Sequence, residues 1–250
     1  MTGATSPRRV LVTGAASGIG RATALLLREQ GVEVVATDRS PDGLAELGRA
    51  GAETVVADVT VANDRAALLS AAGDADGLVN AAGIMRVIPL AAVTDEDWDA
   101  ILAVNLKAAF YLARDLGARM RSGGAIVNLA SVAARRGDNA EVLCYAASKS
   151  AVLAVTRSLA HAYGPRGVRV NAVLPGLIDT PMQDGVLDRV SAIRGVPRDE
   201  LEAGRLEPVV LEHRAGSPRE CAESIAFLLS AASSYVTGQA LSVDGGIVMP

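Results

Sequence analysis

The chain has few aromatic side chains, only two cysteines and no excess of basic charge. Aromatic residues make up 3% of its 250 residues, so the core must be aliphatic, which suits strands that helices bury on both faces. Cys144 and Cys221 stand apart without the spacing of a metal site, and we expect no bound metal. A net charge of −4 argues against a nucleic-acid partner, because binding nucleic acid requires a basic face.

Long apolar runs are also missing. No run approaches the roughly 18–20 apolar residues that a membrane span requires, and residues 1–7 are polar, unlike a signal peptide. Half of the residues are nevertheless hydrophobic, which is enough for a large core. We therefore expect a cytoplasmic protein that does not bind a membrane.

Short apolar runs alternate with amphipathic stretches along most of the chain. The predicted strands are 10–13, 33–37, 54–57, 77–80, 125–129, 169–174 and 240–243. The predicted helices are 19–30, 41–50, 61–72, 96–120, 144–163 and 218–229. This alternation predicts an α/β fold, a Rossmann-like doubly wound parallel sheet with helices on both faces. No linker interrupts it, and we expect a single domain over residues 1–250.

Residues 177–216 break the alternation. Charged helical pieces are interrupted there by Pro181, Pro197 and Pro208. Ligands of such sheets bind at the carboxyl ends of the strands, and this segment follows a predicted strand. We therefore expect a substrate-binding lid, with a surface insertion that has no function as the alternative.

A glycine-rich turn, TGAASGIG at residues 13–20, follows the first predicted strand and opens the first predicted helix. Glycines allow a tight turn, and the N-terminus of a helix attracts a pyrophosphate. The turn is weak evidence alone, but this strand–turn–helix context is what dinucleotide binding requires. The residues expected to bind the cofactor here are Gly14, Ser17, Gly18, Ile19 and Gly20.

Asp38 ends the second strand, 18 residues after Gly20. A carboxylate at this position can accept hydrogen bonds from the adenosine ribose and would repel a 2′-phosphate, which favours NAD. Arg39 could instead bind that phosphate, so NADP is the alternative. Asp38 could also be a helix cap before Pro41.

Tyr145 and Lys149 are four residues apart and share one face of a predicted helix. A free tyrosine has a pKa of about 10, too high for an effective base at neutral pH. A cation nearby stabilises the phenolate and lowers that pKa. The pair can therefore serve in acid/base catalysis, although the same spacing is common on helix surfaces.

Taken together and in order, these motifs resemble the short-chain dehydrogenase/reductase family over residues 9–246. The markers are the turn at 13–20, Asp58-Val59, the turn at 80–83, Asn105, Ser131, Tyr145 with Lys149, Pro175-Gly176 and Asp244-Gly245-Gly246. The resemblance implies an NAD(P)-dependent oxidoreductase that moves a hydride to or from a carbon bearing a secondary alcohol or ketone. It also implies a homotetramer, built on the helices at 96–120 and 145–163 and on the C-terminal segment.

The resemblance also implies a role for each matching residue. Tyr145 would be the general acid/base, and Ser131 would hydrogen-bond the substrate oxygen. Lys149 would bind the nicotinamide ribose and lower the pKa of Tyr145, and Asn105 would hold a water that links Lys149 to solvent. The other cofactor residues that it implies are Asp58, Val59, Asn80, Ala82, Pro175, Gly176, Ile178 and Thr180.

The substrate contacts are less determined by the pattern. The candidates are Ile84, Met85, Arg86, Arg135, Arg136, Asn139, Leu177 and Met182. An arginine among them could bind a carboxylate with two hydrogen bonds, but a solvated arginine on a loop is the more common situation. The segment from Ser131 to Tyr145 is slightly longer than the family pattern and is unusually polar at 138–141.

Three functions remain open. The first is an NAD-dependent dehydrogenase of a sugar, polyol or alicyclic diol. The second is an NADPH-dependent ketoreductase of 3-oxoacyl thioesters, against which Asp38 argues. The third is a catalytically silent regulator that binds a dinucleotide, against which the intact set of Ser131, Tyr145 and Lys149 argues.

Overall fold

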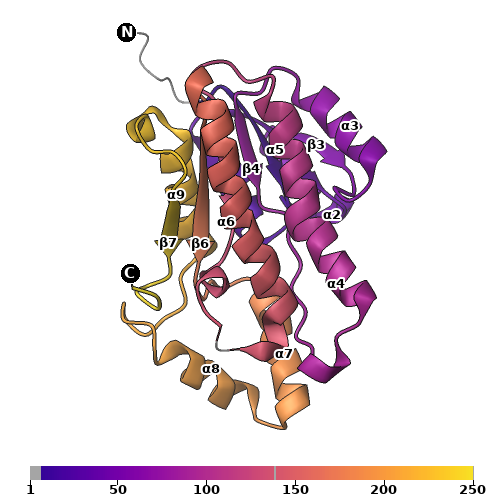
Figure 1. The fold of residues 1–250 in the computed structure, drawn as a ribbon, viewed down its shortest axis with the longest axis vertical. Coiled ribbons are helices and arrows are strands. Elements are labelled where there is room, and N and C mark those ends of the chain that lie inside the picture. The colour runs from indigo at the N-terminus through magenta and orange to yellow at the C-terminus, as the bar shows by residue number, and fades with distance from the viewer. Residues whose placement is uncertain (1–6, 138, 250) are drawn as a thin grey trace.

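The computed structural model describes residues 7–137 and 139–249, in which one parallel sheet lies between two layers of helices (Figure 1). The strands are β1 (Arg9–Thr13), β2 (Glu33–Asp38), β3 (Glu53–Val56), β4 (Gly77–Asn80), β5 (Ala125–Leu129), β6 (Arg169–Pro175) and β7 (Ala240–Val243). Their order across the sheet is β3-β2-β1-β4-β5-β6-β7, and every pair is parallel. This confirms the doubly wound sheet. Residues 1–6, 138 and 250 of the predicted 1–250 domain lie outside the described part.

The inner strands are apolar along their whole length because helices cover both faces of the sheet. Every residue of β4, β5 and β6 is buried, whereas β3 at one edge is mostly exposed. The register aligns Thr13 with Asn80 and Asn80 with Asn128. Polar side chains are therefore lined up at the carboxyl ends of three neighbouring strands, where ligands of such sheets bind.

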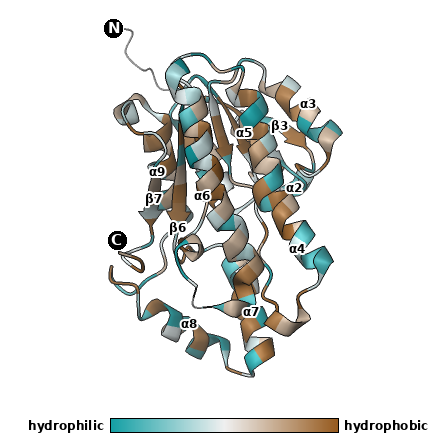
Figure 2. Cartoon of the chain, viewed as in Figure 1, coloured by the Kyte–Doolittle hydropathy of each residue, from teal (hydrophilic) through white to brown (hydrophobic). Residues whose placement is uncertain are grey.

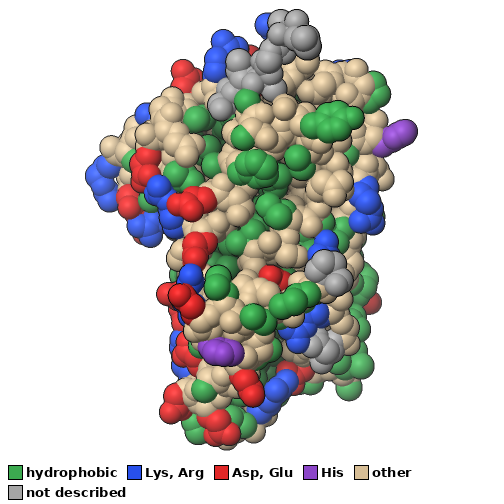
Figure 3. Space-filling model, turned by 90° about the vertical axis from the view of Figure 1, so that its left-hand side faces the viewer, with side chains coloured by type: hydrophobic (Ala, Val, Ile, Leu, Met, Phe, Trp, Pro, Cys, Tyr) green, Lys and Arg blue, Asp and Glu red, His purple; other side chains and the backbone are tan. Residues whose placement is uncertain are grey.

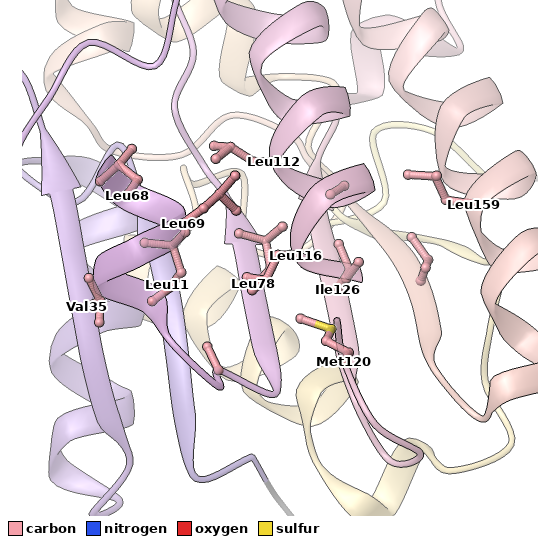
Figure 4. Packing of buried hydrophobic residues seen from close by; sticks show 14 of the residues in the cluster. Leu11, Val35, Leu68, Leu69, Leu78, Leu112, Leu116, Met120, Ile126 and Leu159 are labelled. Carbon is pink, nitrogen blue, oxygen red and sulfur yellow. The ribbon is translucent and has the colours of Figure 1, made fainter. Parts of the chain in front are cut away.

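Two helical layers close the core. The helices are α1 (Gly18–Glu29), α2 (Pro41–Arg49), α3 (Ala62–Ala72), α4 (Asp95–Leu102), α5 (Ala109–Gly117), α6 (Leu143–Tyr163), α7 (Pro181–Arg194), α8 (Arg198–Leu206) and α9 (Pro218–Leu229). One face packs against α3, α5 and α6, where Leu112 and Leu116 contact a cluster that includes Leu78 of β4 (Figure 4). The other face packs against α1, α2 and α9. The colouring of Figure 2 follows this division, with hydrophobic strands inside and mixed helices outside.

The predicted helix at 96–120 is not one regular helix, and that prediction was wrong in this respect. Helix α4 begins after Thr94, whose Oγ1 accepts a hydrogen bond from the Asp97 N–H at 3.2 Å. It ends at Leu102, and a π-helical turn, Ala103–Ala108, precedes α5. Such a turn adds a residue to the helical repeat and often marks a functional position. Here it contains Asn105, which is buried.

Residues 177–216 form a segment that lies beyond the carboxyl ends of the strands and includes α7 and α8 (Figure 1). Its two ends are joined, because the Asp179 N–H donates to the Gly216 carbonyl and the Gly216 N–H donates to the Leu177 carbonyl, both at 2.9 Å. In the described structure α7 buries Leu187 alone, and α8 buries none of its residues. None of the helices in the described part is long and apolar enough to cross a membrane.

Candidate active site

A cavity of about 1150 Å³ lies at the carboxyl ends of the strands, under the segment 177–216. Its wall combines the glycine-rich turn, the ends of β2, β5 and β6, and residues of α7 and α8. Small-molecule sites usually measure about 300–1000 Å³. This cavity therefore has room for a dinucleotide together with a second, smaller molecule.

The glycine-rich turn is tight because its backbone touches its neighbours. A Cβ on Gly14 would lie 2.7 Å from the Ala82 backbone, and a Cβ on Gly20 would lie 2.1 Å from the Gly14 carbonyl oxygen. Gly14 and Gly18 also have positive φ angles, 64° and 52°. Ser17 does not cap α1 with its side chain, so the N-terminus of α1 is available to bind an anion. The turn thus fits a pyrophosphate.

Asp38 is held beside this turn at the end of β2. Its carboxylate accepts hydrogen bonds from the Ala16 N–H at 3.2 Å and the Ser40 N–H at 3.1 Å. The cap of α2 is Ser40, whose Oγ accepts from the Gly43 N–H at 3.3 Å. The alternative of Asp38 as the helix cap is therefore wrong, and its carboxylate lines the cavity.

Arg39 turns toward Asp58 at the rim of the cavity. The Arg39 Nη1 lies 3.7 Å from the Asp58 Oδ2, and the Arg39 side chain is 68% exposed. Asp58 Oδ1 also accepts hydrogen bonds from the Thr60 hydroxyl at 2.7 Å and the Thr60 N–H at 2.8 Å. The hydrogen bond from the Thr60 hydroxyl and the charge of Arg39 lower the pKa of Asp58.

Ser131, Tyr145 and Lys149 form a buried cluster contributed by the end of β5 and by α6. The Ser131 hydroxyl lies near enough to the Tyr145 phenol to lower its pKa. The Lys149 ammonium donates to the Leu129 carbonyl at 2.7 Å and lies 5.6 Å from the centre of the Tyr145 ring. The three residues are 9%, 8% and 4% exposed, in that order. Two hydroxyl groups and one cation are thus held together in the cavity wall, where they can bind a substrate oxygen and exchange a proton with it.

Burial controls the titration of this cluster. It raises the pKa of Tyr145, and the hydrogen bond with Ser131 offsets only part of the rise. It also lowers the pKa of Lys149 to about 8, because the charged ammonium is removed from water. The pKa of Tyr145 is therefore raised, whereas the sequence led us to expect a lowered pKa. The cause is that desolvation of the phenolate outweighs the hydrogen bond with Ser131.

Asn105 lies behind the cavity wall rather than in it. Its Oδ1 accepts from the Ile84 N–H at 2.8 Å, and its Nδ2 donates to the Ile84 carbonyl and the Ser148 hydroxyl, both at 3.0 Å. A Cβ on Gly83 would lie 3.4 Å from the Asn105 Oδ1 and 3.5 Å from the Lys149 Nζ. The side chains of Asn105 and Lys149 thus both approach the backbone of Gly83. The role of Asn105 in holding a water stays a prediction.

Asn80 also lies behind the wall. Its Nδ2 donates to the Asn128 Oδ1 at 2.9 Å, and the Asn128 Nδ2 donates to the Thr156 hydroxyl at 3.0 Å. The Thr13 hydroxyl accepts from the Ala81 and Ala82 N–H groups at 3.1 Å. The sequence did not predict that Thr13, Asn128 and Thr156 bond within the site. Thr13 ends a predicted strand and Asn128 is next to last in another, which was a signal that could have found these two. These bonds hold the loop after β4 against the glycine-rich turn.

The cavity brings most of the predicted site residues together. Those in its wall are Gly14, Ser17, Gly18, Ile19, Gly20, Asp38, Arg39, Asp58, Val59, Ala82, Ile84, Met85, Ser131, Arg136, Asn139, Tyr145, Lys149, Pro175, Gly176, Leu177, Ile178, Thr180 and Met182. Two substrate candidates lie elsewhere. Arg86 pairs with Asp97 at 2.5 Å, and Arg135 donates to the Ala240 carbonyl on β7 at 3.1 Å. The geometry does not favour substrate binding by either arginine.

Helices α7 and α8, together with the residues that flank α8, supply a wall that the sequence did not predict in detail. It includes Gln183, Val186, Leu187, Val190, Arg194, Val196, Glu200, Leu201, Gly204, Arg205 and Pro208. Val186 and Val190 pack on a cluster that contains Tyr145 and Val142. Their helical spacing was a signal that could have found them. Within the part of the chain that the structure describes, no three His, Cys, Asp or Glu side chains gather as a metal site.

Comparisons with known proteins agree with this geometry. A family model described as Enoyl-(Acyl carrier protein) reductase matches residues 14–248. The 3-oxoacyl-(acyl-carrier-protein) reductase FabG of Thermotoga maritima is 38% identical, with 96% of this chain and 97% of the relative covered.

Two crystal structures are similar over nearly the whole chain. One is a short-chain dehydrogenase/reductase, titled glucose/ribitol dehydrogenase, from Brucella melitensis, with a TM-score of 0.87, 35% identity and 100% of both chains covered. The other is an actinorhodin polyketide ketoreductase variant with NADPH, with a TM-score of 0.88, 33% identity, and 96% of this chain and 97% of that chain covered. The chain therefore belongs to the short-chain dehydrogenase/reductase family and is an NAD(P)-dependent oxidoreductase that acts on alcohol or keto carbons.

Proposed function

We propose that this protein is an NAD-dependent oxidoreductase that interconverts a secondary alcohol and a ketone, with Tyr145 as the acid/base. The observation that carries the proposal is the buried cluster of Ser131, Tyr145 and Lys149 in the same cavity wall as the glycine-rich turn. A site that only binds a dinucleotide has no need of this cluster. Its presence therefore argues against a catalytically silent regulator.

The residues of the cluster have separate tasks. The Tyr145 phenol gives a proton to the substrate oxygen during ketone reduction and takes it back during alcohol oxidation. The Ser131 hydroxyl donates a hydrogen bond to the same oxygen and stabilises its developing charge. Lys149 supplies a positive charge where burial makes electrostatic interactions strong, and Asn105 holds a water on its path to solvent. Bound nicotinamide supplies or accepts the hydride.

Asp38 supports NAD as the cofactor. Its carboxylate is fixed by two backbone N–H groups at the cavity wall, where it would accept hydrogen bonds from the adenosine ribose and repel a 2′-phosphate. Asp58 and Val59 would contact the adenine, Asn80 and Ala82 would flank its ribose, and Pro175, Gly176, Ile178 and Thr180 would hold the nicotinamide. The charge of Arg39 is partly offset by Asp58.

An NADPH-dependent ketoreductase of 3-oxoacyl thioesters is the alternative function. Arg39 favours it, because its exposed guanidinium could bind a 2′-phosphate. A ketoreductase structure with NADPH and a 3-oxoacyl reductase are also among the similar proteins. Titration of NAD and NADP against the purified protein separates these cofactors.

A sugar, polyol or alicyclic diol is the proposed substrate class. Support comes from the similarity to the protein titled glucose/ribitol dehydrogenase and from a wall in which Asn139 and Glu200 accompany the apolar side chains. Leu177 and Met182 would contact the substrate at the start of the segment 177–216. That segment is the lid, because its helices cover the cavity while burying little of themselves against the sheet.

We further propose a homotetramer that works in the cytoplasm. Apolar side chains are exposed on the face that carries β7 and α9 (Figure 3). Phe227 of α9 is 42% exposed, and Leu241 of β7 is 38% exposed. The other interface would be formed by α4, α5 and α6. Size-exclusion chromatography with light scattering measures the mass, and a monomer in solution would contradict this assembly.

A screen of secondary alcohols tests the proposed function. The purified protein is mixed with NAD or NADP and with a polyol, a cyclic diol or a 3-hydroxyacyl thioester, and the absorbance of reduced nicotinamide is followed. We expect turnover with NAD and one of the first two classes. Preferred turnover of the thioester with NADP would support the alternative, and cofactor binding without any turnover would support the regulator.

A further inference from the structure

Arg205 of α8 differs from the other paired arginines in the cavity wall. Arg39 lies within ion-pair distance of Asp58, and Arg194 lies 2.6 Å from Glu141. The Arg205 Nη1 instead donates to the neutral Gln183 Oε1 at 3.0 Å. Among the residues that the structure describes, none forms an ion pair with Arg205 or accepts a hydrogen bond from its Nε, which is buried.

An unmatched guanidinium in this position is unfavourable by itself. A buried polar group without a hydrogen-bond partner loses its interactions with water and gains nothing in return. Burial accordingly lowers the pKa of Arg205. Glu202, Asp184 and Asp179 lie near enough for their charges to act on it, but Asp184 forms an ion pair with Arg198. Among the described residues, none of these three carboxylates forms an ion pair with Arg205, so an anionic ligand in the cavity can supply its first ion-pair partner.

The position of Arg205 indicates which end of the cavity it serves. Gln183, its hydrogen-bond partner, lies in the first turn of the lid helix α7, and the Gln183 N–H donates to the Thr180 carbonyl at 2.9 Å. A Cβ on Gly18 would lie 3.2 Å from the Thr180 methyl group. Arg205 is thus connected through two residues to the glycine-rich turn at the N-terminus of α1, where an anion is favoured.

We propose that Arg205 recognises an anionic oxygen group, a phosphate or a carboxylate, of a molecule bound in this cavity. The Nε and Nη2 edge of a guanidinium matches two such oxygens with parallel hydrogen bonds. Arg205 lines the cavity, so a molecule bound there can reach its guanidinium. Because Arg205 belongs to the lid, the contact couples lid closure to occupancy. The inference rests on the proposed function, in that the ligand is either the cofactor, through its pyrophosphate, or a substrate that carries a carboxylate.

The first arm of the test asks about the cofactor. NADH and adenosine, which has no phosphate, are titrated by calorimetry against wild type and the variants R205Q, R205K and R189Q. Arg189 is an exposed arginine of the same lid and lies outside the cavity wall, so R189Q removes an equal charge without touching the site. If the anion is the pyrophosphate, R205Q weakens NADH binding by about 10- to 100-fold, since hydrogen bonds to charged groups have this strength. Adenosine affinity stays unchanged, and R205K recovers part of the loss.

The second arm asks about the substrate. The protein saturated with NADH is titrated with acetoacetate and with its uncharged methyl ester. If the anion belongs to the substrate, NADH affinity is unchanged in R205Q, whereas a wild-type preference for acetoacetate disappears. Should R205Q fail to fold, R205K gives the same comparison, because lysine keeps the charge without the planar fork.

The outcomes separate this inference from the proposed function. The role of Arg205 would be overturned if R205Q and R189Q bound NADH with the same affinity and also discriminated equally between acetoacetate and its methyl ester. Failure of the wild type to bind NADH would instead overturn the proposed function, and the inference with it.

Discussion

The ammonium of Lys149 donates a hydrogen bond to the carbonyl oxygen of Leu129, with 2.7 Å between the two atoms. The bond ties α6 to the end of β5, two residues before Ser131. It therefore sets the distance between the two elements that carry the hydroxyl groups of the cluster. The same burial that makes this bond strong keeps the ammonium away from water and lowers its pKa to about 8.

The low pKa of Lys149 predicts a pH limit on ketone reduction. In the proposed mechanism, reduction requires a protonated Tyr145 and a charged Lys149. Burial raises the pKa of Tyr145, so the phenol stays protonated to high pH. The ammonium loses its proton as the pH rises through about 8. We expect kcat/KM for a ketone to fall above that pH in wild type. A pH profile of Lys149→Arg, which keeps its charge, is the control, and a wild-type profile that stays flat to high pH would contradict the assignment.

The same shift predicts a stability effect with a defined sign. Lys149 has its pKa lowered in the folded state, so burying its charge destabilises the fold below about pH 8, by on the order of 3 kcal/mol for a fall from 10.5 to about 8. Between these values the unfolded chain binds more protons, and stability rises with pH. We expect Lys149→Met to melt at a higher temperature than wild type at neutral pH. The difference should shrink as pH increases from 8 toward 10.5, and scanning fluorimetry at several pH values measures it.

Replacing Tyr145 by phenylalanine removes the proposed proton donor and keeps the ring that packs on Val142 and Val190. Turnover should fall by about 100- to 10,000-fold, the usual contribution of a general acid/base. NADH affinity should change little. Steady-state kinetics and a fluorescence titration give the two values. Wild-type turnover in this variant would remove Tyr145 from the mechanism.

Replacing Asp38 tests the choice of cofactor. Asp38→Ala and Asp38→Asn both remove the charge that would repel a 2′-phosphate. The asparagine has one acceptor oxygen, so it can keep one of the two hydrogen bonds from the Ala16 and Ser40 N–H groups. We expect the ratio of kcat/KM for NADP to that for NAD to rise by about tenfold, which corresponds to about 1.4 kcal/mol. An unchanged ratio in both variants would show that Asp38 does not determine the cofactor.

The ion pair between Arg194 and Glu141 connects the end of α7 to the turn Ala140–Val142 across the cavity. Because Arg194 is about half exposed, such a pair is worth no more than about 1 kcal/mol. Glu141→Gln should therefore raise the substrate KM by about two- to fivefold and leave NADH affinity alone. The variant Arg194→Gln should have the same effect, and additive effects in the double variant would show that the two side chains act separately.

The sequence predicted the strands better than the helices that surround the site. Continuous apolar runs are produced by burial on both faces, so β4, β5 and β6 were found with almost their observed ends. The break at Leu102 could not be found, because the π-helical turn around Asn105 leaves the hydrophobic pattern nearly unchanged. It depends on contacts with Ile84 and Ser148, which are distant in sequence.

The site residues also fall into those that a local sequence pattern could identify and those that depend on the fold. The glycine-rich turn, Asp38 and the pair Tyr145 and Lys149 carry local patterns whose chemistry could be read directly. Arg86 and Arg135 were chosen because an arginine near the site could bind a carboxylate, but each turned out to be bonded outside the cavity wall. Arg205 was missed because nothing in its neighbourhood in the sequence shows that the fold leaves its guanidinium unmatched.

The paired backbone contacts between Leu177, Asp179 and Gly216 give the segment 177–216, the proposed lid, a narrow neck. The residues between these anchors, apart from Thr180 and Arg205, can change in number and type while the two chain ends still leave and re-enter the sheet region at one place. A stretch of different helices grafted at this neck would meet the same sheet, the same cluster and the same glycine-rich bend. Variation confined to this segment can therefore change which substrates bind, while the sheet, the cluster of Ser131, Tyr145 and Lys149 and the glycine-rich turn stay the same.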